Sequence, residues 1–203
     1  MSRVEAIKNI LKNSDVLENE ALKQYSYTKT GGNADILVRV KSEEDFQNII
    51  KYSNDNDIDL TILGNGSNVL ISDTGIRGIV VITSELNTIT LSEDNILTCY
   101  AGTTLEELAN FCIGNSLTNL EFSCGIPGSV GGAIFMNAGA YGGEMKDVVQ
   151  KVEVFTRNGE KKTSTPTWCA TGMFTSFRHR FSGSETRKKP ITAIPRKSVW
   201  KPL

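Results

Sequence analysis

The stretch that most constrains the fold is GIPGSVGGAIFMNAGAYGGE, residues 125–144, which holds seven glycines in twenty residues. Its Ile126, Val130 and Ile134 make it too apolar for a flexible linker. Glycine loses more conformational freedom on folding than any other residue, so this density requires a reason in the backbone. Glycines can let elements pack closely, supply positive φ in turns, or let the main chain approach a ligand. The residues alone leave these interpretations open for this glycine-rich stretch.

A second glycine segment, LGNGSNVLIS, covers residues 63–72 and follows an apolar strand pattern. Consecutive backbone N–H groups in such a turn form a concave nest for phosphate oxygens, and the Ser67 hydroxyl adds a donor. The alternative is a tight turn between two strands. The segment lacks the Lys-Ser/Thr pair of a Walker loop and the spacing of G-x-G-x-x-G. Together with the glycine-rich stretch, it indicates a cofactor that carries phosphate.

Residues 1–84 have the pattern of one α+β unit. Val4, Ile7 and Leu11 fall on one face of an amino-terminal helix. Ser42, three residues before Asp45, has the pattern of a helix N-cap. The strands predicted for this unit lie at residues 34–40, 59–63, 69–72 and 78–83.

Residues 85–163 have the pattern of a second α+β unit, so the fold class is α+β with two subdomains. Residues 87–100 predict a hairpin around a polar turn, and Thr103 with Glu106 predicts a capped helix. Asn158-Gly159, between strand-like runs, predicts another hairpin. Phe135 is expected in the core.

The remaining residues, 164–203, are expected to form a poorly ordered basic tail. Residues 161–203 hold ten Lys and Arg against one acidic residue, whereas residues 1–160 hold 12 against 22. Both tryptophans and four of the five prolines lie in this last part, which has little periodicity. The overall net charge of -1 argues against nucleic-acid binding by the main body. Only the tail has a basic composition that is compatible with binding an acidic partner or nucleic acid.

Composition narrows the remaining classes of protein. The sequence has no run of about 18 apolar residues, so we expect no membrane segment. The four cysteines form no C-x-x-C pair, as is typical of reduced thiols in a cytoplasmic protein. His179 is the only histidine, which excludes two-histidine metal sites and argues against a Ser-His-Asp triad. We therefore expect a cytoplasmic protein without a metal site, and the oligomeric state is not indicated.

Three motifs, taken in order and spacing, resemble one known family. They are TGGNAD at residues 30–35, LGNGSNVL at 63–70 and the glycine-rich stretch. This pattern is similar to UDP-N-acetylenolpyruvoylglucosamine reductase, the flavoenzyme of peptidoglycan synthesis also called UDP-N-acetylmuramate dehydrogenase, over about residues 5–163. The resemblance implies an FAD-binding fold of the vanillyl-alcohol oxidase type, with FAD between two α+β subdomains.

The resemblance also implies which residues bind the cofactor. In the family the loop matching residues 64–68 holds the FAD pyrophosphate, and the glycine-rich stretch runs along the rest of the cofactor. No histidine falls in these motifs, so binding is expected to be non-covalent. The implied cofactor-binding residues are Thr30, Gly31, Gly32, Gly64, Asn65, Gly66, Ser67, Asn68, Gly125, Pro127, Gly128, Ser129, Gly131, Gly132, Asn137, Gly139, Ala140, Tyr141 and Gly142.

The family reaction uses NADPH to reduce FAD and then passes a hydride to UDP-N-acetylglucosamine enolpyruvate, which gives UDP-N-acetylmuramate. A serine donates a proton, while an arginine and a glutamate stabilise the enolate-like intermediate. Arg178 matches the arginine of the family's Tyr-Arg-x-Ser, but Arg180 stands where the serine is expected. No residue here matches the serine or the glutamate. We therefore expect a C-terminally truncated or frameshifted member without the C-terminal substrate domain and with little turnover.

Two alternatives belong to other classes of function. One is a non-catalytic module that binds flavin or nucleotide and uses the basic tail for a partner. The other is an inert folded fragment.

Overall fold

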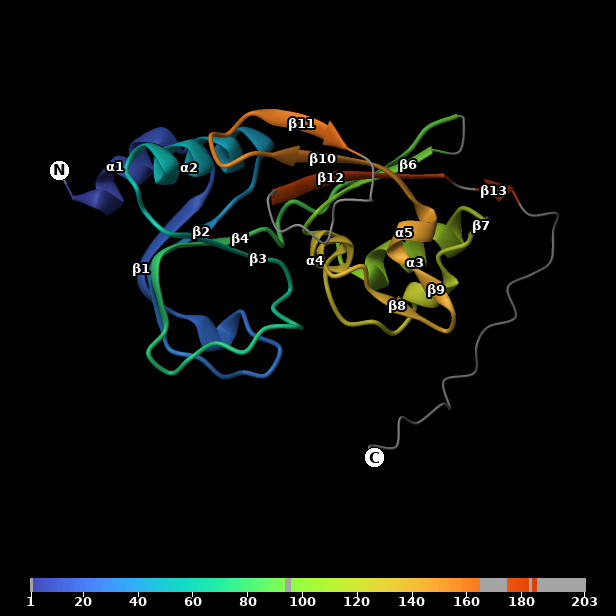
Figure 1. Cartoon of the computed structure of the whole chain (residues 1–203), viewed down its shortest axis with the longest axis horizontal. Helices are drawn as coiled ribbons and strands as arrows, with labels where there is room; N and C mark the ends of the chain where they lie inside the picture. The colour runs from blue at the N-terminus through green and yellow to red at the C-terminus, as the bar shows by residue number, and fades with distance from the viewer. Residues whose placement is uncertain (1, 94–95, 165–174, 183, 186–203) are drawn as a thin grey trace.

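The computed structural model describes residues 2–93, 96–164, 175–182 and 184–185, which form two α+β units side by side (Figure 1). The first unit contains a four-stranded sheet in the order β1-β2-β4-β3. Its strands are β1 (Asp15–Ala21), β2 (Asn33–Arg39), β4 (Ile76–Ile82) and β3 (Leu60–Leu63). β1 is antiparallel to β2, whereas β2, β4 and β3 are parallel to one another. β3 is therefore the edge strand that faces away from β1.

Alternating side chains on the central strands give this sheet two apolar faces. Ile36 and Val38 of β2 pack with α1 (Arg3–Ile10) and α2 (Glu43–Asp55) on one face. Leu37 lies on the other face, where η1 (Leu22–Gln24) and the chain after β3 cover it. Successive side chains of a strand point to opposite faces, so a run of apolar residues is buried from both sides.

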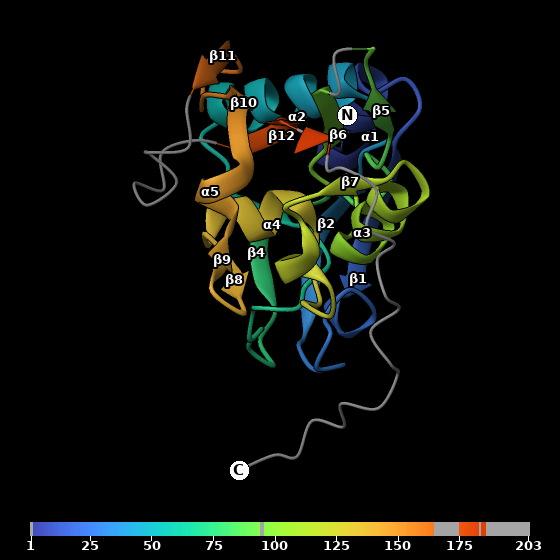
Figure 2. The same cartoon turned by 90° about the vertical axis from the view of Figure 1, so that its right-hand side faces the viewer.

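The second unit is built on a five-stranded antiparallel sheet in the order β11-β10-β12-β6-β5. Its strands are β11 (Lys161–Ser164), β10 (Val149–Phe155), β12 (Thr175–Ser182), β6 (Ile96–Tyr100) and β5 (Ile89–Leu91). Figure 2 looks onto this unit and shows its three helices on one side of the sheet. These helices are α3 (Leu105–Gly114), α4 (Val130–Phe135) and α5 (Met145–Val148).

Short elements complete the second unit. They are β7 (Leu117–Thr118), η2 (Glu121–Ser123), β8 (Gly139–Ala140), β9 (Gly143–Glu144) and β13 (Ser184–Glu185). β8 and β9 form a small hairpin, and β13 pairs with β7. The buried core of the unit lies between the sheet and the helices, with Leu97, Leu108 and Val152 among its members.

The expectation of a poorly ordered tail over 164–203 needs correction at residues 175–182. The structure places them in β12, between β10 and β6, in antiparallel register with both. Without β12 these two strands would each present an unpaired edge to solvent, and backbone pairing removes both edges. The rest of the expected tail, apart from 184–185 and the last residue of β11, lies outside the described residues.

Most predicted elements are confirmed, with four local corrections. The predicted strand at 69–72 is absent from the sheet, and Leu70 is exposed. The predicted cap of the 103–112 helix is shifted by one residue, because Thr104 and Glu107 form the capping box of α3. Phe135, expected in the core, is 52% exposed. β1 was not predicted, because its DVLENEA sequence is too polar for a strand pattern.

The boundary at residue 84 stays a prediction. The first sheet ends with β4 at Ile82, and the second begins with β5 at Ile89.

Within the described residues, no helix is long and apolar enough to cross a membrane.

Candidate functional site

The two glycine segments, about sixty residues apart in sequence, meet between the units. The glycine loop, residues 64–68, directly follows β3, at the carboxyl end of three parallel strands. A Cβ on Gly64 would lie only 2.1 Å from Ser129 Oγ, and a Cβ on Gly128 would lie 3.0 Å from Ser67 Oγ. Side chains at either glycine would separate the two backbones, so the close approach requires both.

The part of the glycine-rich stretch that meets the loop is residues 127–132, here called the cavity half. Backbone hydrogen bonds fix it to the chain before α3: Val130 N–H donates to Thr103 O at 2.7 Å and Gly131 N–H to Ala101 O at 2.9 Å. Ser129 is the N-cap of α4, and its Oγ accepts from Gly132 N–H at 3.3 Å. The first N–H groups of α4 are thereby satisfied within the protein.

The glycine loop differs because its own N–H groups have no acceptor among the described residues. Gly66 adopts a φ of 62°, and its carbonyl accepts from Tyr27 N–H at 3.0 Å. No described residue accepts a hydrogen bond from the backbone N–H groups of residues 64–68. Backbone donors require a partner, and consecutive free donors in a turn form a nest for an anion.

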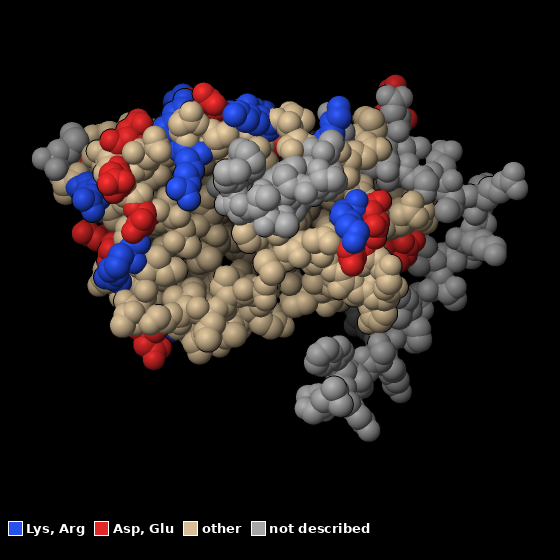
Figure 3. Space-filling view, viewed as in Figure 1, with Lys and Arg blue, Asp and Glu red and all other residues tan. Residues whose placement is uncertain are grey.

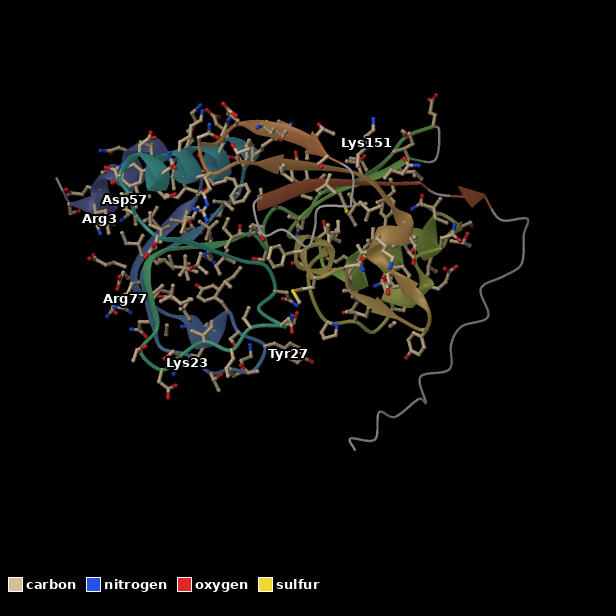
Figure 4. The ribbon with its side chains drawn as sticks, viewed as in Figure 1. Arg3, Lys23, Tyr27, Asp57, Arg77 and Lys151 are labelled. Atoms are coloured by element: carbon tan, nitrogen blue, oxygen red, sulfur yellow. The ribbon has the colours of Figure 1, made fainter. Side chains whose placement is uncertain are left out.

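A cavity of about 930 Å³ extends along β3 and between the units. Such a volume lies within the roughly 300–1,000 Å³ of small-molecule sites. In Figure 4, Asp57 marks the outer end of the first unit, and Tyr27 extends from its loop toward the second unit. Arg157 is the only Lys or Arg among the described residues that line the cavity. Figure 3 shows charged side chains gathered over α1 and α2, and a mainly uncharged surface in the lower middle of this face.

Of the predicted cofactor-binding residues, ten line this cavity. They are Gly64, Asn65, Gly66, Ser67, Asn68, Pro127, Gly128, Ser129, Gly131 and Gly132. The structure thus brings the glycine loop and the cavity half together at one wall of a single cavity.

The predicted residues Thr30, Gly31 and Gly32 do not line the cavity, and the two glycines lie against residues 71–75, which follow the glycine loop. Gly32 N–H donates to Ser72 O at 2.9 Å, which ties this turn to the chain after the loop. Thr30 continues a row of hydroxyl contacts, 2.7 Å from Ser26 to Thr28 and 2.8 Å from Thr28 to Thr30. This turn therefore supports the chain segment that contacts Gly66.

The later part of the glycine-rich stretch, residues 137–144, is here called the hairpin half, and of its residues only Ala138 lines the cavity. Asn137 donates to Glu144 at 2.8 Å and accepts from Lys146 N–H at 3.0 Å. Tyr141 is 89% exposed at the turn between β8 and β9. The predicted residues Gly139, Ala140 and Gly142 belong to the same hairpin, and Gly125 precedes the cavity half with a φ of 87°.

The predicted residue Arg178 lies in β12, opposite Tyr100 of β6 and Glu153 of β10. This places its backbone in the middle of the second sheet.

Several cavity residues were not predicted from sequence. They include Thr83, Ala101, Leu105, Phe135, Met136, Phe155 and Arg157. Phe135 and Met136 could have been found from sequence, because they are apolar residues inside the glycine-rich stretch. In the structure both are about half exposed. Arg157 gives no local signal, since it is an ordinary charged residue beside a turn.

Two thiols of the second unit, those of Cys99 and Cys112, are structural. Cys99 and Cys112 are buried in its core, and Cys124 is a free thiol that is partly exposed. Burial raises the pKa of Cys112 to about 11 and also raises that of Cys99. A thiol with a raised pKa is a poor nucleophile, so neither supplies chemistry at neutral pH.

Comparison with known proteins gives the class that this geometry defines. Residues 34–164 match the FAD binding domain family, and the chain belongs to this family. A solved chitooligosaccharide oxidase superposes with a TM-score of 0.73 at 10% identity, covering 91% of this chain and 44% of that one. That likeness concerns the fold alone, which is the FAD-binding fold of the vanillyl-alcohol oxidase type.

More specific relatives are UDP-N-acetylenolpyruvoylglucosamine reductases. The protein of that name from Listeria welshimeri is 54% identical over 144 residues, which is 71% of this chain and 48% of the relative. The crystal structure of the Thermus caldophilus reductase has a TM-score of 0.67 at 29% identity, covering 88% of this chain and 64% of that one. The resemblance read from the motifs is confirmed, and the chain spans about half the length of the curated relatives it matches.

Proposed function

We propose that this chain binds FAD non-covalently between its two units, with the boundary between them at residue 84. We propose further that it serves an NADPH-using reductase that converts UDP-N-acetylglucosamine enolpyruvate to UDP-N-acetylmuramate in peptidoglycan synthesis. The names of its relatives support this activity and the sugar-nucleotide substrate.

The observation that carries the proposal is the row of N–H groups at residues 64–68, which have no acceptor in the described part of the chain and lie beside Gly128 and Ser129 at the cavity wall. A diphosphate fits this site, because its oxygens accept hydrogen bonds and the glycines leave room for a close approach. No histidine is among the described residues that line the cavity, which supports non-covalent binding.

When bound, FAD would supply a ring system that accepts a hydride from NADPH and donates it to the substrate. The residues of the chain have other tasks. The glycine loop would hold the diphosphate, and the cavity half would fix the distance between the two units. Phe135 and Met136 would keep water from the apolar part of the cavity, since both line it.

We also propose that this chain alone has little reductase turnover. The family's proton-donating serine and assisting glutamate have no matching residue in this sequence, and only Arg178 matches its catalytic arginine. NADPH oxidation should therefore show little dependence on the enolpyruvyl sugar nucleotide. Robust substrate-dependent oxidation would overturn this part of the proposal and leave FAD binding intact.

The experiment that tests the site is a fluorescence titration of the purified protein with FAD and, separately, with riboflavin. Riboflavin has the same ring system and no phosphate. Two charge-assisted hydrogen bonds, at about 1.5 kcal/mol each, correspond to roughly a hundredfold tighter binding of FAD. Equal affinities for the two flavins would contradict a phosphate-binding glycine loop, and binding of neither would contradict the proposed function.

A further inference from the structure

The two units touch at a second place, remote from the glycine segments. There the turn between β10 and β11 rests on α2 of the first unit. Gln47 Nε2 donates to Gly159 O at 2.8 Å, and Lys161 Nζ lies 3.0 Å from Glu43 Oε1. Beneath them the rings of Phe46 and Phe155 meet edge to face at 5.9 Å, both fully buried.

This second contact between the units requires a glycine in the Asn158-Gly159 turn. Gly159 has a φ of 75°, which a glycine adopts without strain. A Cβ at this position would lie 2.4 Å from Lys51 Cγ, so the absence of a side chain lets the turn approach α2 closely. Phe155 packs in the core of the first unit, although its strand, β10, belongs to the second unit.

The cavity lies between the two contacts. Its wall at the glycine segments is formed by residues 64–68 and 127–132, while Phe155 and Arg157 line it near the β10–β11 turn. Glu43, Gln47 and Lys161 do not line it. The contact between α2 and the β10–β11 turn is therefore made in part by residues outside the cavity.

We propose that Glu43, Gln47 and Lys161 are positioning residues that hold the two units at the separation which the cofactor requires. This inference rests on the proposed function, because its readout is FAD affinity. A ligand that contacts both units binds more tightly when the units are already held in the bound arrangement. Releasing the turn from α2 substitutes no residue that lines the cavity, but it removes this pre-organisation.

The test is a double-mutant cycle across the contact, read as the FAD dissociation constant from flavin fluorescence. Lys161→Glu places a carboxylate beside Glu43 and Glu153 and should raise the dissociation constant on the order of fivefold. Combining it with Glu43→Lys restores one attractive pair between the units, so the double variant should bind FAD more tightly than Lys161→Glu alone. A local effect on either unit would not produce this rescue.

The matched control is Lys162→Glu, the same charge change one residue along β11. Lys162 lies 3.8 Å from Glu160 of its own hairpin, and it has no contact with α2 among the described residues. Its FAD affinity should equal that of the wild type. Gln47→Ala is an independent variant, which removes the hydrogen bond to Gly159 without changing charge and should also weaken binding.

The outcomes separate this inference from the proposed function. No FAD binding by the wild type would overturn the proposed function itself. Wild-type binding with unchanged affinity in both Lys161→Glu and Gln47→Ala would overturn the positioning role alone. A loss in Lys161→Glu that Glu43→Lys does not reduce would also contradict it, because the effect would then come from the second unit.

Discussion

The two halves of the glycine-rich stretch hold three glycines each, but Gly131 in one half and Gly142 in the other need glycine for different reasons. The cavity half, residues 127–132, needs small residues because other backbone lies against it: a Cβ on Gly131 would be 2.7 Å from Ala101 Cβ. In the hairpin half, residues 137–144, Gly142 has open space around it and a φ of 85°. The first half uses glycine for close approach, and the turn of the second uses it for conformation.

The halves also differ in what holds them. The cavity half is fixed by backbone hydrogen bonds to residues 101–105, and Ser129 and Val130 are buried. The hairpin half is held by the backbone pairing of β8 with β9 and by side chains of its own segment, since Glu144 contacts both Asn137 and Lys146. Substitutions in the two halves should therefore affect stability and FAD binding to different extents.

The largest effect is expected for Gly131→Ala. The added methyl group meets Ala101 Cβ and the Ala101 carbonyl, so the α4 backbone must shift. Overpacking of this kind costs about 2–3 kcal/mol of the free energy of unfolding. Urea unfolding measures the loss, and FAD titration should show weaker binding in the same variant. A variant as stable as the wild type would break the close-approach interpretation of this half.

A smaller effect on stability is expected for Gly64→Ala, in the glycine loop that meets the cavity half. Its Cβ would meet Ser129 Oγ, so this hydroxyl must rotate away and stop capping α4. Loss of an N-cap costs about 1 kcal/mol, and the units must also separate slightly. FAD affinity should fall more than thermal stability does. Unchanged FAD affinity, with a normal melting temperature, would show that the glycine loop is not part of the FAD site.

Gly142→Ala tests the comparison in the hairpin half. Only the positive φ is disturbed, which costs about 1 kcal/mol for a residue with a side chain. Gly142→Asn is the matched control, because asparagine tolerates this conformation better. FAD affinity should stay at the wild-type value in both variants. A clear loss of affinity would place the hairpin half in the cofactor site, as the resemblance to the reductase family implies.

The smallest effect is a pH dependence confined to the hairpin half. The contacts with Lys146 and Asn137 lower the pKa of Glu144 below its ordinary value of 4.5. A lowered pKa in the folded state stabilises the hairpin above pH 4.5, and this contribution is lost as the pH falls through the folded value. Amide exchange of Gly139 and Gly142 should therefore accelerate in acid. Glu144→Gln is the control, and its exchange should lack this acid-dependent step.

The sequence was informative where one residue type has one physical explanation. Ser42 predicted the start of α2 and Asn158-Gly159 predicted the β10–β11 turn, because caps and tight turns are local. The meeting of Gly64 with Ser129 was not predictable from spacing alone, since it depends on how two units pack. The resemblance to the reductase family supplied that step.

Other features were hidden because tertiary contacts decide them. β12 lies in a segment whose composition predicted disorder, and the open edges of β6 and β10 account for its pairing. Arg157 and Phe155 reach the cavity only through the docking of their turn on α2. Neither position carries a glycine or a motif that could mark it as part of a site.

The most direct test of the central claim is the visible absorption spectrum of the purified wild-type protein, recorded after FAD is added and the excess removed. The glycine loop and the cavity half together form the cofactor site in this account, so flavin absorption should remain with the protein at about one FAD per chain. Complete loss of the flavin on removal of the excess, from a protein that is folded by circular dichroism, would contradict it.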